Sequence, residues 1–137
     1  MATPDELRAT LAEARATFRE AIEEAEMGWR RGPGDGAWTA QEVAEHVIQI
    51  EARITTMVCE ACGYPGIEVG EPDCASSIEA VDEFDAVVSR CDAKLQYVTA
   101  EDLEKPHEHF GNVAAIFEMN AQHLAEHTAQ LLGASSS

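Results

Sequence analysis

Apolar residues recur along most of the chain at spacings of three and four, which is the period of a helix that buries one face. No stretch alternates apolar and polar residues for long enough to predict a strand. The pattern predicts an all-α protein, and a length of 137 residues suits a single domain spanning residues 1–137. The four expected helices lie at about residues 4–28, 40–62, 77–97 and 112–133.

Helix boundaries are marked by local sequence signals. Gly63, followed by Pro65, is the expected C-cap of the second helix because glycine tolerates the left-handed backbone that ends many helices. The first three helices each open with a Ser or Thr that precedes a Glu by three residues, which is the spacing of a capping box. These pairs are Thr3 with Glu6, Thr39 with Glu42, and Ser76 with Glu79.

Two histidines lie near the end of the fourth expected helix. His123 and His127 are four residues apart, so a helix places both imidazoles on one face, close enough to share a divalent metal ion. The apolar stripe of this helix runs through Leu124 and Leu131, and His127 falls on it at the same spacing. We therefore expect His127 to point into the core and His123 to lie at its edge. The pair alone fits either a metal site or one core histidine and one surface histidine.

The candidate third ligand is His46, about seven residues after the N-cap of the second helix and roughly 10 Å along its axis. His127 and His123 lie roughly 8 and 14 Å from the end of the fourth helix. The three share one level only if the second and fourth helices are antiparallel neighbours. The connection from Gly63 to Ser76 must then cross the bundle, and its extended reach of roughly 45 Å is sufficient. The sequence thus predicts a four-helix bundle, up-down-down-up, with a long crossover between helices 2 and 3.

Residues 38–47, WTAQEVAEHV, followed by residues 123–131, HLAEHTAQL, resemble the DinB-like (YfiT-like) superfamily of four-helix bundles. The resemblance covers essentially the whole chain, including the order of the helices. It implies an up-down-down-up bundle that binds one metal ion. The residues that match the metal ligands of the family are His46, His123 and His127.

Three neutral imidazoles leave at least one coordination position open, which favours chemistry over a purely structural site. Zinc and nickel both suit such ligands. The resemblance implies a thiol-dependent transferase that takes a low-molecular-weight thiol as cosubstrate, or a metal-dependent hydrolase. A metal-binding or interaction protein without turnover is the remaining alternative. Glu42, one turn before His46, could orient that histidine or act as a base, or it could only close its capping box with Thr39.

The charge of the chain limits its partners. Nine basic and 26 acidic residues give a net charge of −17, which repels a phosphate backbone and favours divalent metals. No apolar run reaches membrane-spanning length, and no signal segment opens the chain. We therefore expect a cytoplasmic protein with a small-molecule substrate that binds neither nucleic acid nor a membrane. The sequence leaves a homodimer open.

The cysteines are expected to be reduced, because no signal segment directs the chain to an oxidising compartment. Cys59 and Cys62 have the spacing of a redox pair, but they end a helix, where the dipole opposes a thiolate. They could instead form a second, structural zinc site with His107 and His109, or be small core residues. Cys74 is expected near the three-histidine end, where it could line the mouth, and Cys91 lies on the third apolar stripe.

Overall fold

The computed structural model describes residues 2–137 and confirms the all-α class. Four long helices carry the fold: α1 (Pro4–Glu24), α2 (Ala40–Cys62), α3 (Ser77–Leu95) and α5 (Val113–Ser135). No helix in residues 2–137 is both long enough and apolar enough to cross a membrane. The minor elements are the 3₁₀ helix η1 (Glu26–Gly28), the one-turn helix α4 (Ala100–Leu103) and the strands β1 (Pro106–His107) and β2 (Gly111–Asn112).

The helix starts follow the predicted signals closely. Thr3 and Thr39 each form a reciprocal capping box with the glutamate three residues later. Ser76 accepts from the Glu79 amide as expected, but the Glu79 carboxylate accepts from the amide of Ala75 instead of closing the box. Gly63 ends α2 with φ of 84°, the left-handed conformation that glycine adopts without a steric penalty.

Three helix ends and one small sheet differ from the prediction, and the third helix ends at Leu95 rather than near residue 97. The first helix ends at Glu24 and tightens into η1, where a Cβ on Gly28 would collide with the backbone carbonyl of Ser135. The last helix continues past Gly133 to Ser135. The strands β1 and β2 pair antiparallel across the turn before α5, a ladder too short for alternating polarity to reveal it.

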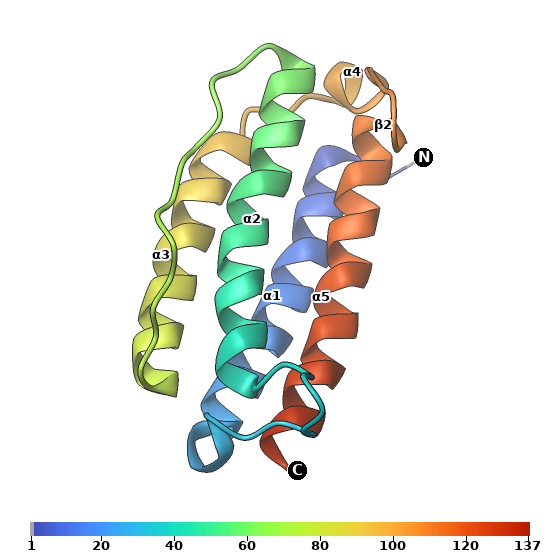
Figure 1. Cartoon of the computed structure of the whole chain (residues 1–137). Helices are drawn as coiled ribbons and strands as arrows, with labels where there is room; N and C mark the ends of the chain where they lie inside the picture. The colour runs from blue at the N-terminus through green and yellow to red at the C-terminus, as the bar shows by residue number, and fades with distance from the viewer. Residues whose placement is uncertain (1) are drawn as a thin grey trace.

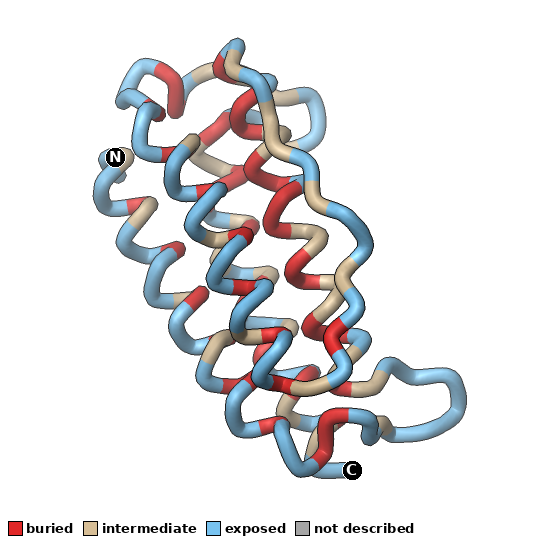
Figure 2. Tube along the Cα trace, turned by 90° about the vertical axis from the view of Figure 1, so that its left-hand side faces the viewer, coloured by how far each residue is buried: buried red, intermediate tan, exposed pale blue. Residues whose placement is uncertain are grey.

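The helices pack around the core in a ring. In Figure 1, α1 and α5 run downward while α2 and α3 both run upward. Helix α1 packs against α5 and α3, and α2 packs against α3 and α5. Segment 64–76 connects the top of α2 to the bottom of α3 by running down the outside of the bundle. Figure 2 shows that each long helix carries its buried residues on one side and exposed residues on the other.

The descending segment is held at both ends by hydrogen bonds. The Thr56 hydroxyl donates to the carbonyl of Ile67 at 3.0 Å and accepts from its amide at 3.1 Å. Near the lower end, the indole of Trp29 donates to the carbonyl of Cys74 at 2.9 Å. These bonds satisfy backbone groups that no helix or strand pairs. They fix a connection that is long and otherwise irregular.

A buried polar cluster joins all four long helices. The Arg15 guanidinium on α1 donates to the Glu51 carboxylate on α2 at 2.5 Å and to Asp92 on α3 at 2.8 Å. The side-chain amide of Asn120 on α5 donates to the other Glu51 oxygen at 2.9 Å. Burial opposes the charge on Arg15, but the Glu51 carboxylate outweighs it and raises the arginine pKa. The apolar residues of α1 recur through Leu11, Ala14 and Phe18, and this pattern predicts Ala14 on the buried face; the structure instead buries Arg15 and leaves Ala14 partly buried.

Replacing Glu51 by Ala is expected to destabilise the protein by about 3–5 kcal/mol, because it leaves the Arg15 charge buried without its main partner. Asp92→Ala is the matched control: its side chain is 51% exposed, and water replaces it beside the guanidinium. Urea unfolding curves of the two variants measure the difference. Equal losses of unfolding free energy for both variants would contradict this role for Glu51.

Candidate metal centre

His46 is positioned by the start of α2. The Thr39 capping box fixes the first turn, and His46 follows in the second turn. The Trp38 ring lies just before the helix, with its centroid 4.8 Å from that of the His46 ring, and remains 39% exposed. His46 therefore has an aromatic neighbour that still faces solvent.

The three predicted histidines come together between α2 and α5. His123 and His127 project from successive turns of α5, and their Nε2 atoms are 2.9 Å apart. The ring of His46 lies 5.0 Å from that of His127 and 6.0 Å from that of His123, centroid to centroid. One ligand atom from each histidine lies within 4.8 Å of the other two. This arrangement could hold one metal ion.

The burial of the histidine pair differs from the prediction. His127 is only half-buried, as is His123, so placing His127 in the core was wrong. The buried position belongs to Thr128, whose hydroxyl donates to the Leu124 carbonyl at 2.8 Å. A straight helix has 3.6 residues per turn, so a stripe counted as alternating steps of three and four drifts around it. The drift leaves both imidazoles at the edge of the core.

Gln130 orients one of the rings. Its side-chain oxygen lies 2.7 Å from Nδ1 of His127, one turn earlier on α5. With the amide oxygen as the acceptor, the bond selects the tautomer in which Nδ1 carries the proton and Nε2 keeps its lone pair. Metal-binding histidines are commonly fixed by such a bond to the second ring nitrogen. The spacing of three residues was the only sequence signal for this contact.

Glu42 serves its capping box. Its side chain is exposed, and its carboxylate accepts from the Thr39 amide at 3.0 Å. The neighbouring Glu45 is engaged as well: it accepts from the amide of Cys74 at 2.7 Å and from the side chain of Gln41. The carboxylates of Glu42 and Glu45, which precede His46, therefore both accept hydrogen bonds from backbone amides.

Electrostatics favour neutral imidazoles at this site. Burial lowers the pKa of His46, and positive charge on His127 or His123 would lower it further. Burial also lowers the pKa of His123. Positive charge on His127 would lower this pKa further, whereas the carboxylates of Glu126 and Glu51 raise it. A neutral imidazole keeps the lone pair that binds a metal ion. The site is thus prepared for a cation near neutral pH.

The alternative metal site predicted from the cysteines does not form. Across residues 2–137, His46, His123 and His127 are the only group of at least three His, Cys, Asp or Glu residues close enough to hold an ion. Cys59 and Cys62 are buried, and burial raises the pKa of Cys62 to about 11. Both residues therefore fit the alternative of small core side chains.

Cys74 does not line the mouth of the site. It is fully buried, and its thiol donates to the Glu83 carboxylate at 3.3 Å. Burial, together with this bond, raises its pKa.

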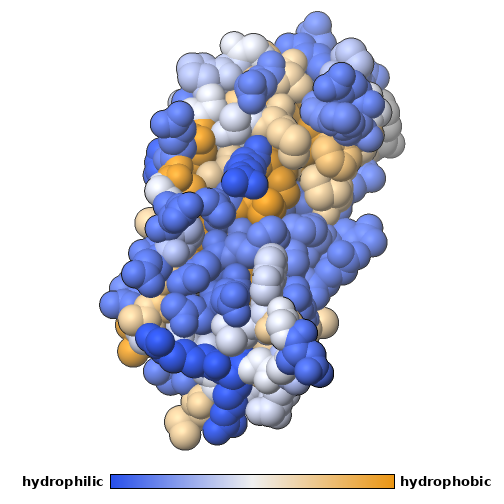
Figure 3. Space-filling view, viewed as in Figure 1, coloured by the Kyte–Doolittle hydropathy of each residue, from blue (hydrophilic) through white to orange (hydrophobic). Residues whose placement is uncertain are grey.

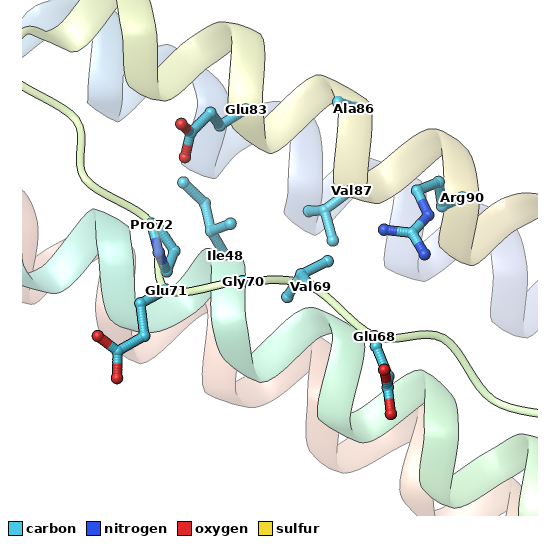
Figure 4. Close-up of a pocket in the computed structure, with 10 residues that line it drawn as sticks. All are labelled: Ile48, Glu68, Val69, Gly70, Glu71, Pro72, Glu83, Ala86, Val87 and Arg90. Atoms are coloured by element: carbon cyan, nitrogen blue, oxygen red, sulfur yellow. The ribbon is translucent and has the colours of Figure 1, made fainter.

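A separate groove lies on the other side of α2. Figure 4 shows it between the descending segment and α3, with Ile48 and Val87 at its floor and Glu83 and Arg90 on α3. Its volume is about 360 Å³. None of the three histidines lines it, so this groove is not part of the candidate metal centre.

Comparison with known proteins identifies the family of the chain. No curated protein matches the chain. The family model described as the DinB superfamily matches residues 6–131, a span that contains α2, nearly all of α5 and all three histidines. The chain therefore belongs to the DinB superfamily.

Proposed function

We propose that the protein binds one divalent metal ion through His46, His123 and His127 and acts on a small molecule there. The observation that carries the proposal is the convergence of three histidine nitrogens from two helices within 4.8 Å. Membership of a superfamily whose members generally bind metal supports it. Zinc and nickel are the proposed ions, since both accept imidazole ligands.

The donor set fits such an ion. Zinc binds histidine nitrogen at about 2.0–2.1 Å, which places neighbouring ligand atoms about 3.3 Å apart in a tetrahedron. The Nε2 atoms of His123 and His127 are 2.9 Å apart, and all three ligand atoms lie within 4.8 Å of one another, so the rings would need to rotate to reach this spacing. Three protein ligands leave a fourth position for a reactant. When bound, the ion supplies Lewis acidity, which lowers the pKa of a thiol or a water molecule that joins it.

A thiol-dependent transferase is the reaction class we favour. The four cysteines are buried in the structure, and burial raises the thiol pKa at each, so the chain presents no nucleophilic thiol of its own. A low-molecular-weight thiol from solution would take the open position. The three histidines would hold the ion, and the thiol in its open position would be placed for attack on an electrophile. Gln130 would keep His127 in the tautomer that leaves Nε2 free to bind the ion.

Hydrolysis is the second candidate. It needs a residue that accepts a proton from the attacking water. Glu42 and Glu45 are the carboxylates nearest His46 in sequence, and both already accept backbone hydrogen bonds. These bonds weaken the case for Glu42 or Glu45 as that base, and a metal-binding protein without turnover is the remaining alternative. In each case the net charge of −17 supports a small-molecule ligand rather than nucleic acid.

The purified protein is expected to bind one zinc or nickel ion per chain. Replacing His123 by Ala leaves two ligands and should weaken metal affinity by at least about 100-fold, more than the loss of an orienting residue costs. His109→Ala is the control, because His109 is an exposed histidine of the turn between β1 and β2. Elemental analysis and a competitive chelator titration measure both effects. Equal affinities in the two variants would overturn the proposed ligand set.

The stability conferred by the site is expected to depend on pH. The pKa values of His46 and His123 are lowered in the folded chain, so between those values and about 6.5 the unfolded chain binds more protons. The contribution of these two histidines to the free energy of unfolding is therefore present above about pH 6.5. It is lost as the pH falls through their lowered pKa values. A bound metal ion lowers the histidine pKa values further, so acidification should cost the metal-loaded protein more stability than the metal-free protein.

Thermal melts of metal-loaded and metal-free protein between roughly pH 8 and 5 measure this difference. The two curves should converge as the pH falls. Superimposable curves over the whole range would mean that the histidines are packing residues without a metal.

A further inference from the structure

Arg53 lies on the same face of α2 as His46. The two residues are seven apart, close to two full turns, which separates them by roughly 10 Å along the helix axis. Arg53 is exposed, and within residues 2–137 its guanidinium makes no ion pair, although the chain carries 26 acidic residues. Within the described part of the chain, Arg53 is thus a free cation about two helical turns from one of the three histidines.

Arg53 also lines a second groove, which none of the three histidines lines but which includes Gln49, one turn from His46. Gln49, one turn beyond His46, and Thr56 lie on the same wall, and the descending segment closes the other side. The groove has a volume of about 470 Å³, which suits a small molecule. Glu60 and Glu68 make its far end negative. Among the residues that line the groove, Arg53 carries the positive charge, so an anionic group is favoured beside Arg53 rather than beside the two glutamates.

The surface between the histidines and Arg53 is partly apolar. Ile50 lies one turn beyond His46 on α2, and Met119 lies one turn before His123 on the antiparallel α5. Both side chains are partly buried against the core. Figure 3 shows hydrophobic side chains gathered over the upper halves of α2 and α5, above a hydrophilic band. A ligand that spans this region would place hydrocarbon on it.

We propose that Arg53 binds the carboxylate of a small molecule whose reacting atom lies at the three-histidine site and whose apolar middle covers Ile50. This inference rests on the proposed function and specifies its substrate class. A guanidinium pairs with a carboxylate through two parallel hydrogen bonds. A singly charged carboxylate suits the site better than a phosphate, because the negative field of the protein opposes a doubly charged group more strongly.

The test uses cobalt-loaded protein and two thiols of equal length, mercaptohexanoate and mercaptohexanol. Each is titrated while the thiolate-to-cobalt charge-transfer band is followed. The acid is expected to bind about fivefold more tightly than the alcohol, as an exposed ion pair would provide. Arg53→Gln should abolish this preference and leave the affinity for the alcohol unchanged, and Arg53→Lys should restore part of it.

Arg90→Gln is the matched control. It removes the same charge from an exposed arginine on α3 that lines the groove of Figure 4. This variant should keep the full preference for the acid. A preference that survives Arg53→Gln, or that Arg90→Gln abolishes equally, would overturn the role of Arg53 while leaving the metal site intact.

A second readout separates failure of the inference from failure of the proposed function. The Arg53 Nε–H resonance is followed by NMR in both titrations. A shift with the acid but not the alcohol, without any charge-transfer band, would support the carboxylate site and contradict thiol binding at the metal. The absence of both the band and the shift would overturn the two proposals together.

Discussion

The hydrogen bond between Glu51 and Asn120 sets the register of the interface on which the candidate site depends. It crosses from α2 to α5 in the core, and the same carboxylate is held from the other side by Arg15 on α1. Asn120 lies one turn from His123, and Glu51 lies little more than one turn from His46. A slip of one turn between the helices would move these histidines about 5.4 Å apart along the axis. The buried cluster therefore supports the geometry that brings the imidazoles together.

The path of the chain is the second requirement. Since α2 and α3 run in the same direction, the chain must return along the outside of the bundle, and the bonds at Thr56 and Trp29 hold it there. This path leaves α2 and α5 antiparallel, with the second turn of α2 beside the middle turns of α5. It also encloses the two grooves beside α2, so the connection shapes the surroundings of the site as well as the fold.

Much of this could be predicted from the sequence because it depends on local signals. Capping boxes and the period of apolar residues located the long helices, and the spacing of His123 and His127 located one side of the site. Predictions failed where three-dimensional packing decided the outcome. Arg15 is buried because Glu51 faces it from another helix, which no periodicity in α1 reveals. On α5 the apolar stripe drifts around the helix, so the structure buries Thr128 where the sequence predicted His127.

X-ray absorption of the zinc-loaded protein tests the central claim most directly, because it reports the donor atoms of the ion without a substrate. We expect three imidazole nitrogens at about 2.0–2.1 Å, with one light atom in the open position. When one of the three histidines is replaced, the multiple-scattering signal of the imidazole rings should fall by about one third. A sulfur neighbour at about 2.3 Å would place the ion at the cysteines and contradict the account. A shell of oxygen atoms alone would show that the histidines do not bind it.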